Sequence, residues 1–174
     1  CCDVAVVGSG PAGAAVAHAC AQAGLDVLVL EEGGFIHSKD YPADGFNAFA
    51  KLYRNMGTSL TSGKAPMPFL QGRAVGGTSV VNGAISWPLP KDIYDEWAQD
   101  DPGLGEKLPW ESISGAVNQV QKKLSIEPTD PTVAGANNSL MARGAEALGL
   151  SHRPIRRNVE NCMGLGRCLQ GCPQ

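Results

Sequence analysis

The sequence contains no concentration of positive charge. Lys and Arg number 14 against 17 Asp and Glu, a net charge of -3, and no basic run is longer than a pair such as Arg156 and Arg157. A protein that binds nucleic acid clusters its Lys and Arg residues against the phosphates. A nucleic-acid partner is therefore not expected.

The sequence also contains no uninterrupted apolar segment long enough to span a bilayer. Residues 4–25 carry no formally charged side chain, but Pro11 and several glycines interrupt them, and Asp3 and Asp26 flank them. No basic segment precedes this stretch, as it would in a secretory signal. We expect no membrane segment and no signal sequence, and localisation stays open between cytoplasm and periplasm. Internal repeats and low-complexity segments are also lacking.

The ends of the chain contain no features of a complete protein. Residue 1 is not Met, and the last four residues, GCPQ, form no closing element, so we expect a fragment of a larger two-domain protein. We place a nucleotide-binding core with its covering loops at residues 1–108. A helical segment leading into the remainder follows at residues 109–174, where Pro109 can open one helix and a second runs near residues 138–148.

Glycine is abundant, with 22 residues, and it occurs in clusters. The first cluster lies in "DVAVVGSGPAG", where a short apolar strand leads into glycines spaced G-x-G-x-x-G. The alanine-rich stretch from Ala14 to Ala23 predicts a helix, Gly24 ends it, and "DVLVLEE" predicts a second buried strand. Strand, helix and strand in about thirty residues indicate a Rossmann-like α/β unit.

Each glycine of this motif has a chemical purpose. One permits the tight turn, one lets backbone N–H groups approach a pyrophosphate, and one lets helix and strand pack closely, with the helix N-terminus facing the anion. Glu31 ends the second strand, where a carboxylate can accept hydrogen bonds from ribose hydroxyls and would repel a 2′-phosphate. The motif predicts dinucleotide binding and does not choose between FAD and NAD.

A second glycine cluster, "GRAVGGTSVVNGAISW" at residues 72–87, favours FAD. Its glycines alternate with small hydroxyl residues and Asn82. This composition suits backbone donors and short side chains wrapped around a second part of a large cofactor, and nicotinamide enzymes do not need such a loop here.

Together these segments resemble the glucose-methanol-choline (GMC) oxidoreductase family of flavoproteins. The matching pieces are "VVGSGPAGAAVA", "VLVLEEGG", "GRAVGGTSVVNG" and "DIYDEWA". The resemblance implies a Rossmann-like FAD-binding domain. Some members tether the flavin through a His just before the Asn of the second motif, where this chain has Val81, so we expect non-covalent FAD. The predicted cofactor-binding residues are Gly8, Ser9, Gly10, Pro11, Ala12, Gly13, Glu31, Glu32, Arg73, Gly76, Gly77, Thr78, Asn82 and Gly83.

The resemblance implies an FAD-dependent oxidoreductase, dehydrogenase or oxidase, that acts on the CH–OH group of an alcohol or sugar. The partners would be this small-molecule substrate and an external electron acceptor. The family's usual base is a His in a later segment, and no residue of this chain matches it, so no catalytic residue is assigned. The alternative is an electron-transfer or redox module with an iron-sulfur cluster and a structural nucleotide.

Three of the six cysteines, Cys162, Cys168 and Cys172, lie close together in the sequence. Such crowding favours local ligation over the disulfide framework of a small secreted protein. The segment resembles that of the iron-sulfur glucose dehydrogenases of the same family, whose three cluster ligands would map to these cysteines. A structural zinc site, a disulfide and plain reduced thiols remain alternatives.

Overall fold

The computed structural model describes all of residues 1–174, and they divide into two compact units. One unit comprises residues 1–83 and 165–174, and the other comprises residues 84–164. The boundary that we expect after residue 108 concerns the domains of a larger protein, and it stays a prediction.

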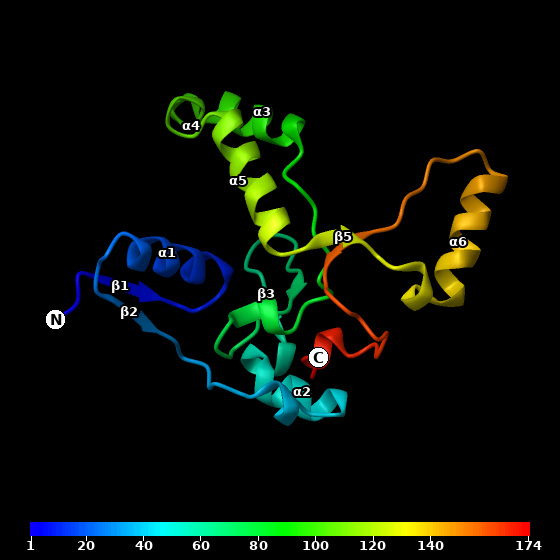
Figure 1. The fold of residues 1–174 in the computed structure, drawn as a ribbon, viewed down its shortest axis with the longest axis horizontal. Coiled ribbons are helices and arrows are strands. Elements are labelled where there is room, and N and C mark those ends of the chain that lie inside the picture. Colours follow the sequence, from blue (N-terminus) through cyan, green and yellow to red (C-terminus); the bar gives the residue numbers. More distant parts are fainter. The chain divides into compact units, whose positions relative to one another are not determined.

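The first unit opens with the predicted strand, helix and strand. Strand β1 (Val4–Val7), helix α1 (Pro11–Gln22) and strand β2 (Val27–Leu30) follow in order, and Figure 1 shows α1 lying along the two strands. The strands are parallel, with a register that runs from Val4 opposite Val27 to Val7 opposite Leu30. Pro11 begins the helix because its missing N–H removes no hydrogen bond in the first turn. The helix thus starts three residues before the predicted Ala14.

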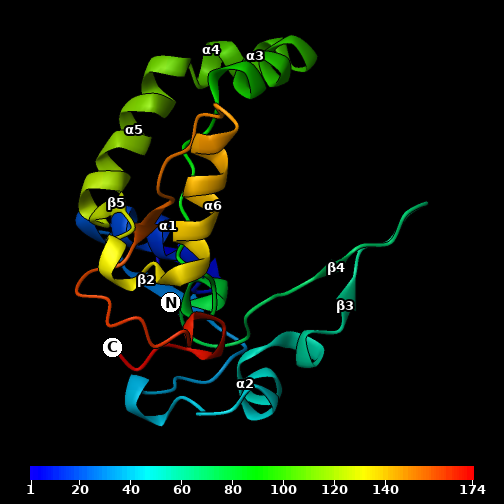
Figure 2. The same ribbon diagram turned by 90° about the vertical axis from the view of Figure 1, so that its right-hand side faces the viewer.

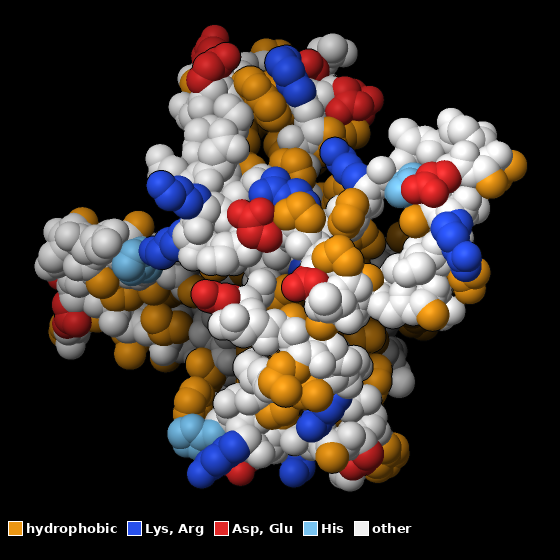
Figure 3. All heavy atoms as spheres, turned by 45° about the vertical axis from the view of Figure 1, so that its right-hand side comes forward, with side chains coloured by type: hydrophobic (Ala, Val, Ile, Leu, Met, Phe, Trp, Pro, Cys, Tyr) orange, Lys and Arg blue, Asp and Glu red, His pale blue; other side chains and the backbone are white.

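The prediction that both strands are buried is wrong for this chain. Val6 is buried, but Val7, Leu28 and Leu30 are exposed. A parallel sheet is normally covered on both faces by helices, whereas this sheet has two strands and packs against α1. Figure 3 shows other apolar side chains at the surface among white polar and backbone atoms.

The core of the first unit forms around helix α2 (Gly45–Leu52). The carboxylate of Asp44 caps this helix by accepting a hydrogen bond from the Asn47 N–H at 2.9 Å, and the hydrogen bonds from Asn47 hold the pKa of Asp44 below its usual value. A short hairpin, β3 (Ser59–Leu60) paired antiparallel with β4 (Pro68–Phe69), follows and projects away from α2 (Figure 2). The buried cluster consists of Ala48, Leu52, Tyr53, Ala74 and Val81.

The segment 165–174 is held against this core by two side chains. The buried Tyr53 hydroxyl lies 3.0 Å from the Val81 carbonyl oxygen and 2.6 Å from that of Leu169, so one donor is shared between two acceptors. Burial raises the pKa of Tyr53, which keeps this hydroxyl protonated. The Arg167 guanidinium donates to the backbone carbonyl of Pro42 at 2.6 Å. Residues distant in sequence thus become neighbours of the second glycine loop.

The second unit is mainly helical. Its helices are α3 (Lys91–Asp100), α4 (Pro102–Lys107), α5 (Trp110–Lys123) and α6 (Gly135–Ala147), and its antiparallel strands are β5 (Ile126–Pro128) and β6 (Arg156–Asn158). The helices predicted after Pro109 and near residues 138–148 are therefore present. None of the helices combines the length and the apolar character that a membrane-spanning segment needs.

Candidate functional site

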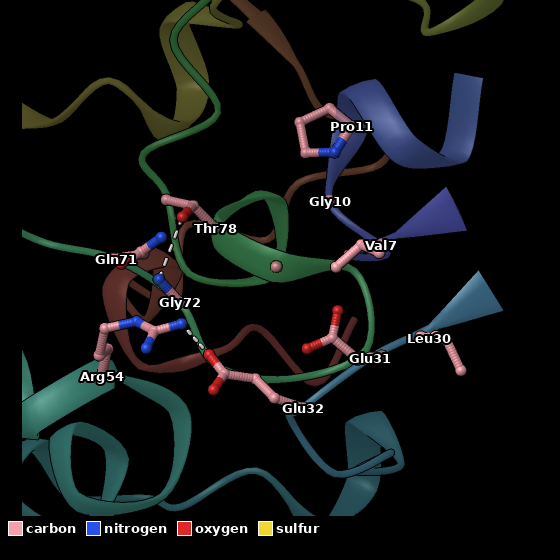
Figure 4. A pocket seen from close by; sticks show the side chains of 12 residues that line it. Val7, Gly10, Pro11, Leu30, Glu31, Glu32, Arg54, Gln71, Gly72 and Thr78 are labelled. Carbon is pink, nitrogen blue, oxygen red and sulfur yellow. Dashed lines mark hydrogen bonds and ion pairs between the residues drawn. The ribbon is translucent and has the colours of Figure 1, made fainter. Parts of the chain in front are cut away.

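The first unit contains a cleft between the two glycine clusters and the end of β2. Its volume is about 460 Å³, within the range of small-molecule and cofactor sites. Figure 4 shows Pro11 at the start of α1, Glu31 and Glu32 after β2, and Thr78 beside Gly72. The residues that line it are Val7, Gly8, Gly10, Pro11, Leu30, Glu31, Glu32, Arg54, Gln71, Gly72, Gly77 and Thr78.

One wall of the cleft is the turn from β1 into α1. Gly10 is the residue before the helix, and no side chain caps the helix start. The first N–H groups of an α-helix have no partner within the helix, and its dipole favours an anion there. Gly13 lets α1 approach β1, because a β-carbon at this position would collide with the carbonyl oxygen of Gly8. This wall therefore presents backbone donors to the cleft.

The opposite wall is the second glycine loop, which makes one 3₁₀ turn at Gly77–Val80. Gly77 has φ +58°, and a β-carbon there would lie 3.0 Å from the Gly10 α-carbon. A side chain at Gly77 would therefore be strained and would press on the first loop. The Thr78 Oγ1 accepts a hydrogen bond from the Gly72 N–H at 3.0 Å. The two glycine loops are thus in direct contact, although they lie more than sixty residues apart in the sequence.

Glu31 is the most strongly hydrogen-bonded side chain of the cleft. Its Oε2 accepts from the Ser9 N–H at 2.8 Å and from the Ser9 hydroxyl at 2.6 Å, and its Oε1 accepts from the Gly33 N–H at 2.8 Å. The hydrogen bonds from Ser9, and to a smaller extent the one from Gly33, hold the pKa of Glu31 below its usual value. Glu31 is therefore a carboxylate at neutral pH. Oε1 still has a lone pair that can accept a hydrogen bond from a ligand.

Glu32 and Arg54 form an ion pair at the edge of the cleft (Figure 4). Both side chains are partly exposed, at 50% and 40%, so solvent screens their attraction and the pair contributes little stability. The Nε of Arg54 is nevertheless buried and has no hydrogen-bond partner. Sequence reasoning missed Arg54 and Gln71 because nothing in their local pattern marks them. Only the packing of α2 and the segment that follows it brings them to the cleft.

The structure brings about half of the predicted cofactor residues into the lining of the cleft, and whether they bind a cofactor stays a prediction. Those in the lining are Gly8, Gly10, Pro11, Glu31, Glu32, Gly77 and Thr78. Those outside it are Ser9, Ala12, Gly13, Arg73, Gly76, Asn82 and Gly83. Among the second group, Ser9 contacts Glu31 and Gly76, and the Arg73 N–H donates to the Leu52 carbonyl oxygen. Ser9 and Arg73 thus bond to neighbouring segments and do not line the cleft.

The predicted three-cysteine site receives no support from the structure. No group of three or more His, Cys, Asp or Glu side chains is placed to hold a metal ion. Cys162 belongs to the second unit, and Cys168 and Cys172 belong to the first. All six cysteines are thiols rather than disulfides.

Comparison with known families identifies the chain. The family model described as GMC oxidoreductase matches residues 49–174, which include the second glycine loop. The chain belongs to the GMC oxidoreductase family. A second model, described as an NAD(P)-binding Rossmann-like domain, matches residues 6–59 and covers the end of β1 and all of α1 and β2. The predicted Rossmann-like α/β fold is therefore confirmed for this GMC oxidoreductase chain.

Individual relatives support the same assignment. An uncharacterised GMC-type oxidoreductase of Mycobacterium tuberculosis is 36% identical over 175 residues, which cover 98% of this chain and 27% of the relative. A GMC-type oxidoreductase of Sinorhizobium fredii is 31% identical over 98% of this chain and 33% of its own length. A long-chain-alcohol oxidase of Arabidopsis thaliana is 35% identical over 99% of this chain and 23% of its own length. The chain thus spans about a quarter to a third of these relatives.

Proposed function

We propose that this chain is the FAD-binding portion of an oxidoreductase that oxidises the CH–OH group of an alcohol. The observation that carries the proposal is the convergence of two glycine loops and the end of β2 on one cleft. A strand, helix and strand unit alone would suit NAD as well as FAD. The second loop adds a further wall of small residues, which suits the greater length of FAD.

The residues of the cleft fit such a cofactor. The uncapped start of α1 would hold the pyrophosphate through backbone N–H groups, because the N–H groups of Gly8 and Ser9 already donate to Leu30 and Glu31. Glu31, through its remaining lone pair, would accept a hydrogen bond from the ribose of the adenosine. The second loop, including Thr78 and continuing to Asn82 and Gly83, would lie along the pyrophosphate and the flavin. The neighbouring carboxylates of Glu31 and Glu32 disfavour a 2′-phosphate at this end.

The chemistry of the reaction would come from the cofactor. When bound, the flavin of FAD supplies a hydride acceptor for the alcohol carbon. This chain would bind and orient it, while the base that removes the hydroxyl proton is not assigned to any residue here. The long-chain-alcohol oxidases among the relatives favour an alcohol substrate over a sugar. A family resemblance does not by itself fix the substrate.

The first test identifies the cofactor and its linkage. The intact protein is expected to purify with FAD and to absorb in the visible range. Val81 stands where some family members carry the His that tethers the flavin, so acid precipitation should leave FAD in the supernatant. Chromatography of the supernatant against FAD and NAD standards measures the result. Flavin that stays with the precipitate would contradict non-covalent binding, and NAD without flavin would contradict the proposed function.

The second test concerns the charge of Glu31. Glu31→Gln is expected to weaken FAD binding by about 1.5 to 3 kcal/mol, the worth of a hydrogen bond to a charged group. Hydrogen bonds from Ser9 and Gly33 lower the pKa of Glu31 in the folded protein. The contribution of its carboxylate to FAD binding should therefore persist below the usual pKa of a glutamate and be lost as the pH falls through the lowered value. Flavin titration from pH 7 down to pH 3 measures both effects.

A matched control for this test is Glu96→Gln, which neutralises an exposed carboxylate on α3 in the second unit. It is expected to leave FAD affinity and its pH dependence unchanged. Equal affinities of the wild type and Glu31→Gln would remove Glu31 from the binding site.

The electron-transfer alternative is not proposed. It rested on a cluster held by Cys162, Cys168 and Cys172, and no observation of the structure or of the relatives favours such a cluster.

A further inference from the structure

Ser9 connects three segments that lie far apart in the sequence. Its hydroxyl donates to Glu31 Oε2 at 2.6 Å and accepts from the Gly76 N–H at 2.9 Å. Its own N–H donates to the same carboxylate oxygen at 2.8 Å, and the other carboxylate oxygen accepts from Gly33. A continuous chain of hydrogen bonds therefore runs from the end of β2 through the first glycine loop to the second.

The donor capacity of the Ser9 side chain is fully used within this chain of bonds. A serine hydroxyl has one O–H to donate, and Ser9 gives it to Glu31. The hydroxyl is therefore not available to donate to a phosphate oxygen. The family resemblance predicts that Ser9 binds the cofactor. In the structure, however, the Ser9 hydroxyl bonds to Glu31 and Gly76 of the protein itself.

We propose that Ser9 is a positioning residue that holds the two glycine loops in their cofactor-binding arrangement before the cofactor binds. This inference rests on the proposed FAD-binding function and adds to it a residue whose side chain need not contact the cofactor. The two loops approach closely, because a β-carbon built at Gly77 would lie 3.0 Å from the Gly10 α-carbon. A preassembled cleft reduces the ordering that binding requires and so increases affinity.

The experiment separates loop positioning from cofactor binding. In the cofactor-free intact protein, hydrogen–deuterium exchange of peptides covering residues 74–80 is expected to be about tenfold faster at the Gly76 amide in Ser9→Ala than in the wild type. FAD affinity of the same variant is expected to fall about tenfold to a hundredfold, because two hydrogen bonds of the hydroxyl are lost. Ser9→Cys keeps the approximate size of the side chain but forms only weak hydrogen bonds. It should therefore also show faster exchange at Gly76 and weaker FAD binding, and it keeps the test valid if the alanine variant folds poorly.

The matched control is Ser114→Ala. It removes a hydroxyl that donates to the Glu111 carbonyl oxygen within α5, in the second unit. It is expected to leave FAD affinity within about twofold of the wild type. A general loss of structure would speed exchange throughout the protein, whereas positioning predicts faster exchange confined to the two loops and the end of β2.

Two results would overturn the inference. One is unchanged exchange at Gly76 in both Ser9 variants, and the other is faster exchange with wild-type FAD affinity. A wild-type protein that binds no FAD would instead contradict the proposed function. The exchange measurement in the cofactor-free protein would still decide whether Ser9 holds the loops together.

Discussion

Gly13→Ala is expected to remove FAD binding and to destabilise the fold. A β-carbon at Gly13 would collide with the Gly8 carbonyl oxygen and would lie 3.3 Å from the Val6 Cγ1. The start of α1 must then move away from β1, and the backbone donors of the first loop move with it. Forced overpacking of this kind lowers the free energy of unfolding by about 1 to 3 kcal/mol. Urea unfolding and flavin titration of the intact protein measure the two effects.

Gly144→Ala is the matched control for this prediction. Gly144 lies within α6, and a β-carbon there would meet no atom within 4 Å. The same substitution at this site is expected to raise the free energy of unfolding by about 0.5 to 1 kcal/mol, because alanine favours a helix over glycine. Loss of stability of similar size at both positions would contradict the steric explanation.

Leu52→Ala is expected to lower the free energy of unfolding by about 2 to 5 kcal/mol. The Leu52 side chain is fully buried, at 0% exposure, and its cluster includes Ala74 and Val81, which lie on either side of the 3₁₀ turn of the second glycine loop. Removal of the side chain would leave a cavity beneath that loop. FAD affinity should therefore fall together with stability, as urea unfolding and flavin titration would show.

Leu140→Ala makes the same change at a position that is 56% exposed on α6. It is expected to change the free energy of unfolding by no more than about 0.5 kcal/mol. Stability lost equally in both variants, or FAD affinity unchanged in Leu52→Ala, would show that the cluster does not support the loop.

Local patterns predicted the elements that depend on short-range physics. The helix after the first glycines and the two strands beside it follow from an apolar run, a glycine turn and alanine-rich propensity. The helix α5 begins directly after Pro109, as predicted from the fixed φ of proline. These features are determined within about a dozen neighbouring residues.

Burial was predicted less well, because it depends on partners rather than on side-chain type. Leu140 and Met141 are large apolar residues of α6, yet both are exposed. Trp87 and Trp97 are also exposed, whereas Tyr94 is buried and donates to the Leu108 carbonyl oxygen at 2.9 Å. An apolar stripe indicates which face can be buried, but a packed neighbour decides whether it is.

The sequence by itself determined the Rossmann-like unit, the glycine positions of both loops and the acidic residue at the end of β2. Each follows from steric or hydrogen-bonding demands that act over a few residues. Only the tertiary structure decided that Ser9 bonds to Glu31 and Gly76, and that Arg54 faces Glu32. Such contacts join segments that are 22 to 67 residues apart, and the packing of α1 and α2 fixes them. No local pattern specifies that packing.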